Sequence, residues 1–122
     1  MAENKQYFTQ VQDNGRVMIS EDVISTIVMQ SLTDIEGYVG LSAKPGADIV
    51  VLIGKKNWRK GIKVTISEND ELTIDCNVVI CYGHSVVAVA QAIQEAVSGA
   101  LQSMTGVNVV SVNVNVCGIG RQ

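Results

Sequence analysis

A long apolar-striped helix followed by an alternating valine strand constrains the fold of this chain more than any other feature. Between Val86 and Met104 apolar residues recur at helical spacing, and a Thr-Gly pair then gives a turn. From Val107 to Val116 the sequence reads Val-Asn-Val-Val-Ser-Val-Asn-Val-Asn-Val, a period of two that is typical of a strand with one buried face. The pattern predicts a domain in which helices pack on a sheet.

The core-facing residues of these two elements follow from their periods. Residues three and four apart share one face of a helix, and alternate residues share one face of a strand. The buried side of the helix is expected to comprise Val86, Ala90, Ile93, Val97, Ala100, Leu101 and Met104. The strand is expected to turn Val110, Val112, Val114 and Val116 inward, and Ser111, Asn113 and Asn115 outward.

Length and composition indicate one small globular domain. The chain has 122 residues, of which 47% are apolar and 17% charged, and its net charge of −3 argues against a general affinity for nucleic acid. No apolar run approaches the roughly 20 residues needed to span a bilayer, and the first residues lack the apolar stretch of a signal peptide. We expect a cytoplasmic protein with a mobile arm over 1–13, one domain over 14–118 and a short tail over 119–122.

The first half of the domain is expected to begin with a short strand around Met18 and a helix. Ser20 is a good N-cap for that helix, which carries an apolar stripe and is expected to end at Gly37. The stripe consists of Val23, Ile24, Ile27, Val28, Leu32 and Ile35. A second short strand is expected over Tyr38 to Leu41. Residues 45–54 suit either a short helix or a buried strand, and we favour the helix.

A hairpin follows. Ile62, Val64 and Ile66 alternate with polar residues, and Glu68 to Glu71 supply the turn. The inner face of the returning strand is Leu72, Ile74, Cys76, Val78 and Ile80, with Thr73, Asp75 and Asn77 outward. The expected order is therefore β-α-β-(α)-β-β-α-β. This order predicts an α+β fold, a two-layer sandwich of a mixed β-sheet with helices on one face.

Basic residues gather in one segment around the only tryptophan. Five of the nine lysines and arginines lie between residues 55 and 63, whereas Val64 to Gly120 contain none. A tryptophan among cations can anchor a protein contact, insert at a membrane surface or stack on bases. The alternative is a solvated loop in which Trp58 covers the edge of the core. The candidate partner-binding residues are Lys55, Lys56, Trp58, Arg59, Lys60 and Lys63.

The cysteines and the single histidine predict no metal or cofactor site. Three cysteines cannot form a complete set of disulfides within one chain, and one histidine is too few for the usual zinc sets. Cys76 and Cys81 are expected on opposite faces of one strand. Cys117 would neighbour Cys81 if their strands pair, which leaves a redox role open for the three thiols. His84 beside Cys81 suggests a Cys–His nucleophile, but no third orienting group is evident, so we interpret His84 as an exposed residue at the helix start, where His84 or Ser85 is the cap.

Several short segments, in order, resemble one known family over residues 15–118. The matching segments are Gly15 to Ile24, Ile35 to Val39, Gly54 to Asn57, Gly61 to Val64, Ile74 to Val79 with Tyr82-Gly83, Thr105-Gly106, and Val112 to Val114. Together they resemble the Asp/Gls envelope-stress-response family, the alkaline shock proteins of Gram-positive bacteria. Cys76, Cys81, Cys117 and His84 depart from the family pattern.

The resemblance implies a non-enzymatic scaffold or regulatory protein linked to cell-envelope stress. Members of the family are abundant cytosolic proteins, and some are recruited to the membrane by a partner protein. We therefore expect a homo-oligomer that binds protein partners, among them a membrane-anchored one, and that uses no cofactor. The alternative hypothesis is a small RNA-binding module that uses the basic Trp58 loop, although the acidic body and the lack of strand aromatics disfavour it.

Overall fold

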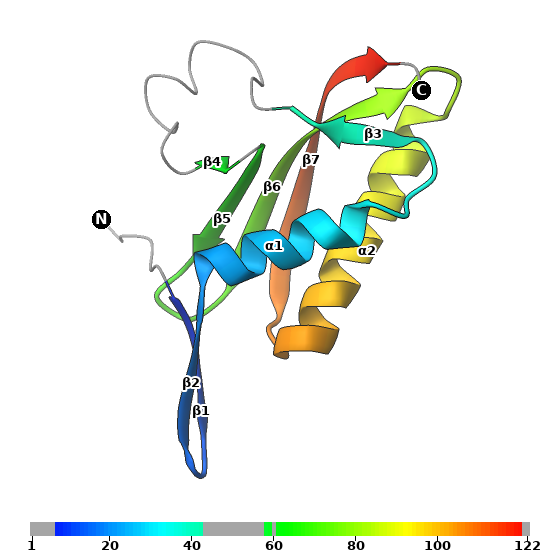
Figure 1. The fold of residues 1–122 in the computed structure, drawn as a ribbon. Coiled ribbons are helices and arrows are strands. Elements are labelled where there is room, and N and C mark those ends of the chain that lie inside the picture. Colours follow the sequence, from blue (N-terminus) through cyan, green and yellow to red (C-terminus); the bar gives the residue numbers. More distant parts are fainter. Residues whose placement is uncertain (1–6, 43–57, 60, 121–122) are drawn as a thin grey trace.

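The computed structural model describes residues 7–42, 58–59 and 61–120, and these residues form two helices and two sheets. The elements in chain order are β1 (Tyr7–Gln12), β2 (Gly15–Ser20), α1 (Glu21–Leu32), β3 (Tyr38–Leu41), β4 (Trp58–Arg59), β5 (Ile62–Ile66), β6 (Leu72–Cys81), α2 (Val86–Thr105) and β7 (Val109–Gly120). Both helices cover the same face of the larger sheet (Figure 1). The predicted α+β sandwich is confirmed, with β1 and β4 as strands that the sequence did not indicate.

Strand β6 is the centre of the larger sheet. One of its edges pairs antiparallel with β5 along the first half and with β3 along the second, while the other edge pairs parallel with β7 over its whole length. Its inner side chains are fully buried, as the alternation predicted: Leu72, Ile74, Cys76, Val78 and Ile80. Helix α2 is the crossover that returns the chain from the end of β6 to the start of β7.

Helix α1 begins where the sequence predicted and ends earlier. The Ser20 hydroxyl accepts a hydrogen bond from the Val23 amide at 3.3 Å, and Ile24, Ile27, Val28 and Leu32 are buried. The prediction that the helix ends at Gly37 is wrong, because its last residue is Leu32 and Thr33 forms the C-cap. The turn that follows is closed by bonds from the Ile35 amide to Leu32 and from the Tyr38 amide to Ile35.

Gly37 holds the turn between α1 and β3 against the start of α2. Its φ of +92° is a left-handed conformation, and its carbonyl accepts a hydrogen bond from the Cys81 amide at 2.8 Å. A Cβ at this position would lie 2.7 Å from Val89 Cγ2 and 2.9 Å from His84 Nδ1. Both the backbone angle and the close packing therefore require glycine here.

Helix α2 has well-defined ends and a stripe that differs from the predicted one. The Ser85 hydroxyl caps its first turn by accepting from the Ala88 amide at 3.2 Å, and Gly106 ends it with a φ of +74°. Its buried residues are Val89, Ile93, Val97, Leu101 and Thr105. The expectation that Val86 and Met104 lie in the core is wrong, since 39% and 68% of these side chains are exposed.

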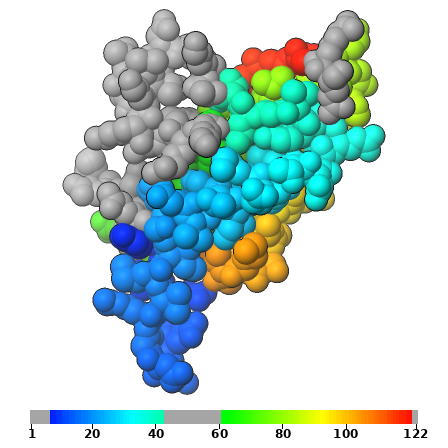
Figure 2. Space-filling view, viewed as in Figure 1, coloured from blue at the N-terminus to red at the C-terminus, as the bar shows by residue number. Residues whose placement is uncertain are grey.

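The first strands form a separate hairpin, which corrects the expectation of a mobile arm for residues 7–12. Strand β1 pairs antiparallel with β2, and the hairpin extends away from the rest of the molecule (Figure 2). Its base is fixed, because Phe8 is buried in the core and the Thr9 amide donates to Asp70 Oδ1 at 3.1 Å. Gln10 Nε2 also donates to the Thr105 carbonyl at 2.9 Å. These bonds join the hairpin to the β5–β6 turn and to the end of α2.

Strand β7 is more exposed than its valine alternation predicted. Val112 is buried and Val114 is partly buried, whereas Val110 is 57% and Val116 is 36% exposed. The inward assignment of Val110 is wrong, because this residue lies in a bulge, while Val116 pairs with the inward Val78 but is not fully covered. The pairing with β6 shifts register at Val110 and at Cys117, and no described strand covers the far edge. The strand also continues through Gly120, which takes Ile119 and Gly120 out of the predicted tail.

The choice between helix and strand for residues 45–54 falls outside the described residues. Asn77 lies on the outer face as predicted, where it pairs with Asn115, but it is fully buried instead of solvated, at the point where β6 changes partner from β5 to β3. There the backbone N–H of Asn77 donates to the Gly61 carbonyl, and the backbone carbonyl of Asn77 accepts from the Ser42 amide.

The Gly37 packing generates a prediction about stability. Gly37→Ala should lower the free energy of unfolding by about 2–4 kcal/mol, because it combines left-handed strain with a steric clash. Gly83→Ala is the matched control, since Gly83 has a φ of +98° but a Cβ there would meet no atom within 4 Å. Gly83→Ala should lower the free energy of unfolding only by the left-handed backbone strain, about 1–2 kcal/mol. Urea unfolding measures both, and equal losses would show that the contact with α2 contributes nothing.

A second prediction concerns the buried thiol of Cys76. Burial, and next the nearby Asp75 carboxylate, raise the pKa of Cys76 to about 12. In the unfolded chain the thiol ionises near pH ~8.5. The unfolded state therefore binds fewer protons above that pH, and the free energy of unfolding should fall as pH rises from about 8.5 to about 12, by at most about 1.4 kcal/mol per pH unit.

Urea unfolding at several pH values checks this prediction. Cys76→Ala should show a shallower decline of stability above about pH 8.5 than the wild-type chain, because it lacks the buried acid. Cys117→Ala is the control, since burial raises the pKa of this exposed thiol less than that of Cys76, and its removal should change the profile less. Parallel profiles for the wild type and Cys76→Ala would contradict the assignment.

Candidate functional site

The predicted basic segment is only partly within the described residues. Lys55, Lys56 and Lys60 lie outside them. Trp58 and Arg59 form β4, which pairs antiparallel with β5 so that Trp58 is opposite Lys63 and Arg59 is opposite Ile62. The interpretation of these two residues as a solvated loop is therefore wrong, because they add a short edge strand to the sheet. The role of the segment in binding a partner stays a prediction.

Lys63 is the one member of this segment whose side-chain environment is described. It lies half-buried on the outer face of β5, the face that the helices do not cover, and its cross-strand neighbour is Asp75 on β6. Opposite charges on directly paired residues attract each other and lower the local positive potential. This weakens the case for a broad nucleic-acid surface, and the strand faces that the structure describes here present amides and hydroxyls instead of stacked aromatic rings.

The outer face of the sheet carries a row of paired amides and carboxylates. Asn113 Nδ2 donates to Asp75 Oδ1 and Asn115 Nδ2 donates to Asn77 Oδ1, both at 3.0 Å, across the parallel β6–β7 pair. Asn77 Nδ2 is buried and has no hydrogen-bond partner among the described residues. The side-chain pairs fix the relative register of β6 and β7, because a shift of one residue would place Asn113 and Asn115 on the wrong face.

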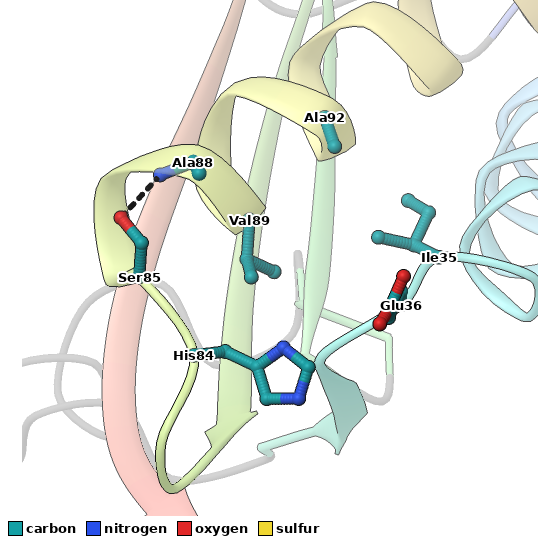
Figure 3. A pocket seen from close by; sticks show the side chains of 7 residues that line it. All are labelled: Ile35, Glu36, His84, Ser85, Ala88, Val89 and Ala92. Atoms are coloured by element: carbon teal, nitrogen blue, oxygen red, sulfur yellow. Dashed lines mark hydrogen bonds between the residues drawn. The ribbon is translucent and has the colours of Figure 1, made fainter.

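A hollow of about 400 Å³ lies between the turn after α1 and the first two turns of α2 (Figure 3). Glu36 and Ile35 border it from the turn, and His84 and Ser85 border it from the start of the helix. Its remaining lining is apolar and comes from Ala88, Val89 and Ala92. The close approach of Gly37 to His84 and Val89 positions these two sides, so the hollow depends on the same packing that requires a glycine there.

The hollow brings together residues that are far apart in the sequence. Of the two candidate caps, Ser85 is the residue whose hydroxyl caps the helix, and the His84 imidazole shares the hollow with the Glu36 carboxylate. Sequence reasoning did not identify Glu36, because its position beside His84 depends on the pairing of β3 with the end of β6. The only sequence signal was that both residues adjoin a glycine-containing turn.

The proposed Cys–His pair is not assembled. Cys81 Sγ donates to the carbonyl of the adjacent Tyr82 at 3.6 Å, and Cys81 does not border the hollow that contains His84. A thiol becomes a strong nucleophile when a base or a helix N-terminus stabilises its thiolate. Neither arrangement is formed at Cys81 in the part of the chain that the structure describes.

The possible redox pairing of Cys81 with Cys117 is also disfavoured. Their strands do pair, but Cys81 is opposite Gly120 and Cys117 lies in the bulge between the partners of Val78 and Val79. Three residues of strand separate the two positions, which is about 10 Å along the strand direction. A disulfide requires Cα atoms within about 7 Å of each other.

A second hollow, of about 290 Å³, lies between the two helices and is almost entirely apolar. Thr26, Ile27, Gln30 and Ser31 border it from α1, and Ala100 and the exposed Met104 border it from α2. No group of three or more potential metal-binding side chains occurs in the described parts of the chain. Within the same parts, no helix is long and apolar enough to cross a membrane.

Comparison with known proteins identifies the family of this chain. A family model described as the Asp-23 family, with a cell envelope-related function, matches residues 9–121. Bacillus subtilis (strain 168) has a relative named uncharacterized protein YqhY, which is 30% identical over 105 residues, or 86% of this chain and 77% of that protein. Uncharacterized protein Spy1614 of Streptococcus pyogenes serotype M6 is 35% identical over 105 residues, or 84% of this chain and 86% of that protein.

A third relative, uncharacterized protein YloU of Bacillus subtilis (strain 168), is 28% identical over 107 residues, which is 86% of this chain and 88% of that protein. No solved structure matches the chain. The family match extends over nearly all of the described fold, from β1 to the end of β7. The resemblance noted in the sequence is thus confirmed, and the chain belongs to the Asp-23 family, the alkaline shock proteins, whose function is related to the cell envelope.

Proposed function

We propose that this protein is a non-enzymatic scaffold or regulatory protein of the cell-envelope stress response, which acts from the cytoplasm through self-association and protein partners. The observation that carries the proposal is the match of residues 9–121 to a family with a cell envelope-related function. A membrane-anchored partner would then bring the protein to the envelope, and the basic segment from Lys55 to Lys63 is the candidate surface for that contact.

Two features of the described residues support a binding role over a catalytic one. The Cys81 thiol and the His84 imidazole, the nucleophile and base that the sequence suggested, have different contacts: the thiol donates to the Tyr82 carbonyl, and only His84 borders the hollow. The sheet has one face covered by helices and one face that carries hydrogen-bonded amides and a carboxylate, which suits contact with another protein surface.

Genetic complementation tests whether the function needs catalysis. A strain that lacks the protein should be more sensitive to an envelope stress such as a shift to alkaline medium, and the wild-type chain should restore growth. Cys81→Ala and His84→Ala should restore growth equally well, provided that circular dichroism shows both variants folded. A folded variant that fails to complement would contradict a non-enzymatic role and would assign chemistry to that residue.

The partner-binding role of the basic segment is tested by charge reversal. Changing Lys55, Lys56, Arg59 and Lys60 to glutamate should reduce recovery of the protein with washed membranes at least about tenfold, because each contact between opposite charges is lost and replaced by repulsion. Arg16→Glu is the control, since Arg16 lies exposed on the separate hairpin. Crosslinking in the cell followed by mass spectrometry identifies what the wild-type segment contacts.

Three outcomes of that experiment are distinguishable. Loss of membrane recovery in the charge-reversed variant alone supports the basic segment as the partner surface. Equal recovery of both variants and the wild type with membranes would show that the partner contact lies on another surface. Recovery of RNA in place of protein crosslinks, with a steep dependence on salt, would favour the RNA-binding alternative.

A further inference from the structure

The free edge of β7 is the longest backbone surface that the described residues leave without a partner. Strand β7 has 12 residues and pairs with β6 on one side, and no described strand lies on its other side. Such an edge presents unpaired N–H and C=O groups that can bind another strand. Gln94 on α2 covers only one position, by donating its Nε2 to the Val112 carbonyl at 3.0 Å.

The usual means of protecting a sheet edge are missing from the middle of this strand. Natural proteins discourage edge pairing with lysines, prolines, inward charges, bulges or short strands. From Val107 to Gly120 the sequence contains no charged residue and no proline. Bulges occur only near the two ends, at Val110 and Cys117, and the stretch between them, Ser111 to Val116, runs in regular register with β6.

Exposed side chains along this edge can also contact a further strand. Val110, Val116 and Ile119 are large apolar residues that are 57%, 36% and 52% exposed. Asn113 and Asn115 each donate a side-chain hydrogen bond to β6 of the same chain. Each side-chain amide keeps an acceptor oxygen and a second N–H for further bonds. A further strand would thus find both an apolar row and an amide row to extend.

We infer that β7 binds β7 of a second copy of this chain in an antiparallel pair, which joins the two sheets into one. This inference rests on the self-association in the proposed function and identifies the surface that performs it. A second copy is the occupant because the strand is complementary to itself. In an antiparallel pair related by a two-fold axis, directly opposed residues share a face, so registers centred on Asn113 or Val114 place valine against valine and amide or hydroxyl against amide. The uncharged edge also meets its copy without repulsion.

The test uses the purified full-length chain and two readouts. Sedimentation velocity over a range of concentrations measures the dissociation constant of the dimer. Amide hydrogen exchange measures protection of residues 111–116, which should increase with protein concentration because the edge amides gain partners. Protection that rises in the hairpin residues 15–20 instead would place the interface there and overturn the inference.

Asn113→Lys is the main variant. A lysine here retains Asp75 as a partner within its own chain, so the fold should tolerate it, while a long charged side chain at the edge should weaken dimerisation at least about tenfold. Val116→Lys is a second variant on the opposite face of the strand and should act in the same direction. Val11→Lys is the matched control, because Val11 is 83% exposed on the hairpin, and it should leave the dissociation constant unchanged.

The outcomes separate this inference from the proposed function. If the wild-type chain and the variants Asn113→Lys and Val116→Lys have the same dissociation constant, the assignment of the interface to the β7 edge is overturned, but self-association itself stands. A wild-type chain that stays monomeric at every concentration would overturn the inference together with the self-association, and leave the partner contact to be judged by membrane recovery. Protection of residues 111–116 only when a captured partner protein is added would overturn the inference too, since the edge would then bind a foreign strand.

Discussion

The burial of the inner face of β6 against α1 and α2 is the interaction on which the other elements depend. Five side chains of this inner face are removed completely from solvent, and each contributes about 1.5–3 kcal/mol of hydrophobic free energy when it is a large aliphatic residue. The same strand forms the backbone bonds that hold β3, β5 and β7. The hollow near His84 and the amide row near Asn115 both lie where they do because β6 fixes the elements around them.

Sequence patterns predicted the elements whose two faces meet different surroundings. The alternation in β5 and in the inner face of β6 is confirmed, since apolar residues meet the helices and polar residues do not. Strand β1 was missed because its residues show no regular alternation and its position depends on distant contacts from Thr9 to Asp70 and from Gln10 to Thr105. The two-residue strand β4 is too short to have a period at all.

The errors in β7 and in the candidate site have a shared physical cause. Alternation shows which residues of a strand share a face, but it does not show whether another strand or helix covers that face. Val110 and Val116 remain exposed because Val110 lies in one bulge and Val116 lies next to the other, in a strand whose far edge no described strand covers. Glu36 and His84 come together through a pairing between β3 and β6, and Asn77 is buried where β6 changes partner, so no local signal revealed either arrangement.

The proposed self-association and the proposed partner contact would use opposite edges of the larger sheet. Strand β4, with Trp58 and Arg59, lies at one edge of the larger sheet, and β7 lies at the other, with β5 and β6 between them. Three strand spacings separate the two edges, or about 14 Å. Two copies joined through β7 would therefore carry their β4 strands at the two outer edges of a continuous sheet. Each copy could then hold a partner through its basic segment without competing with the dimer contact, which is the geometry that a scaffold requires.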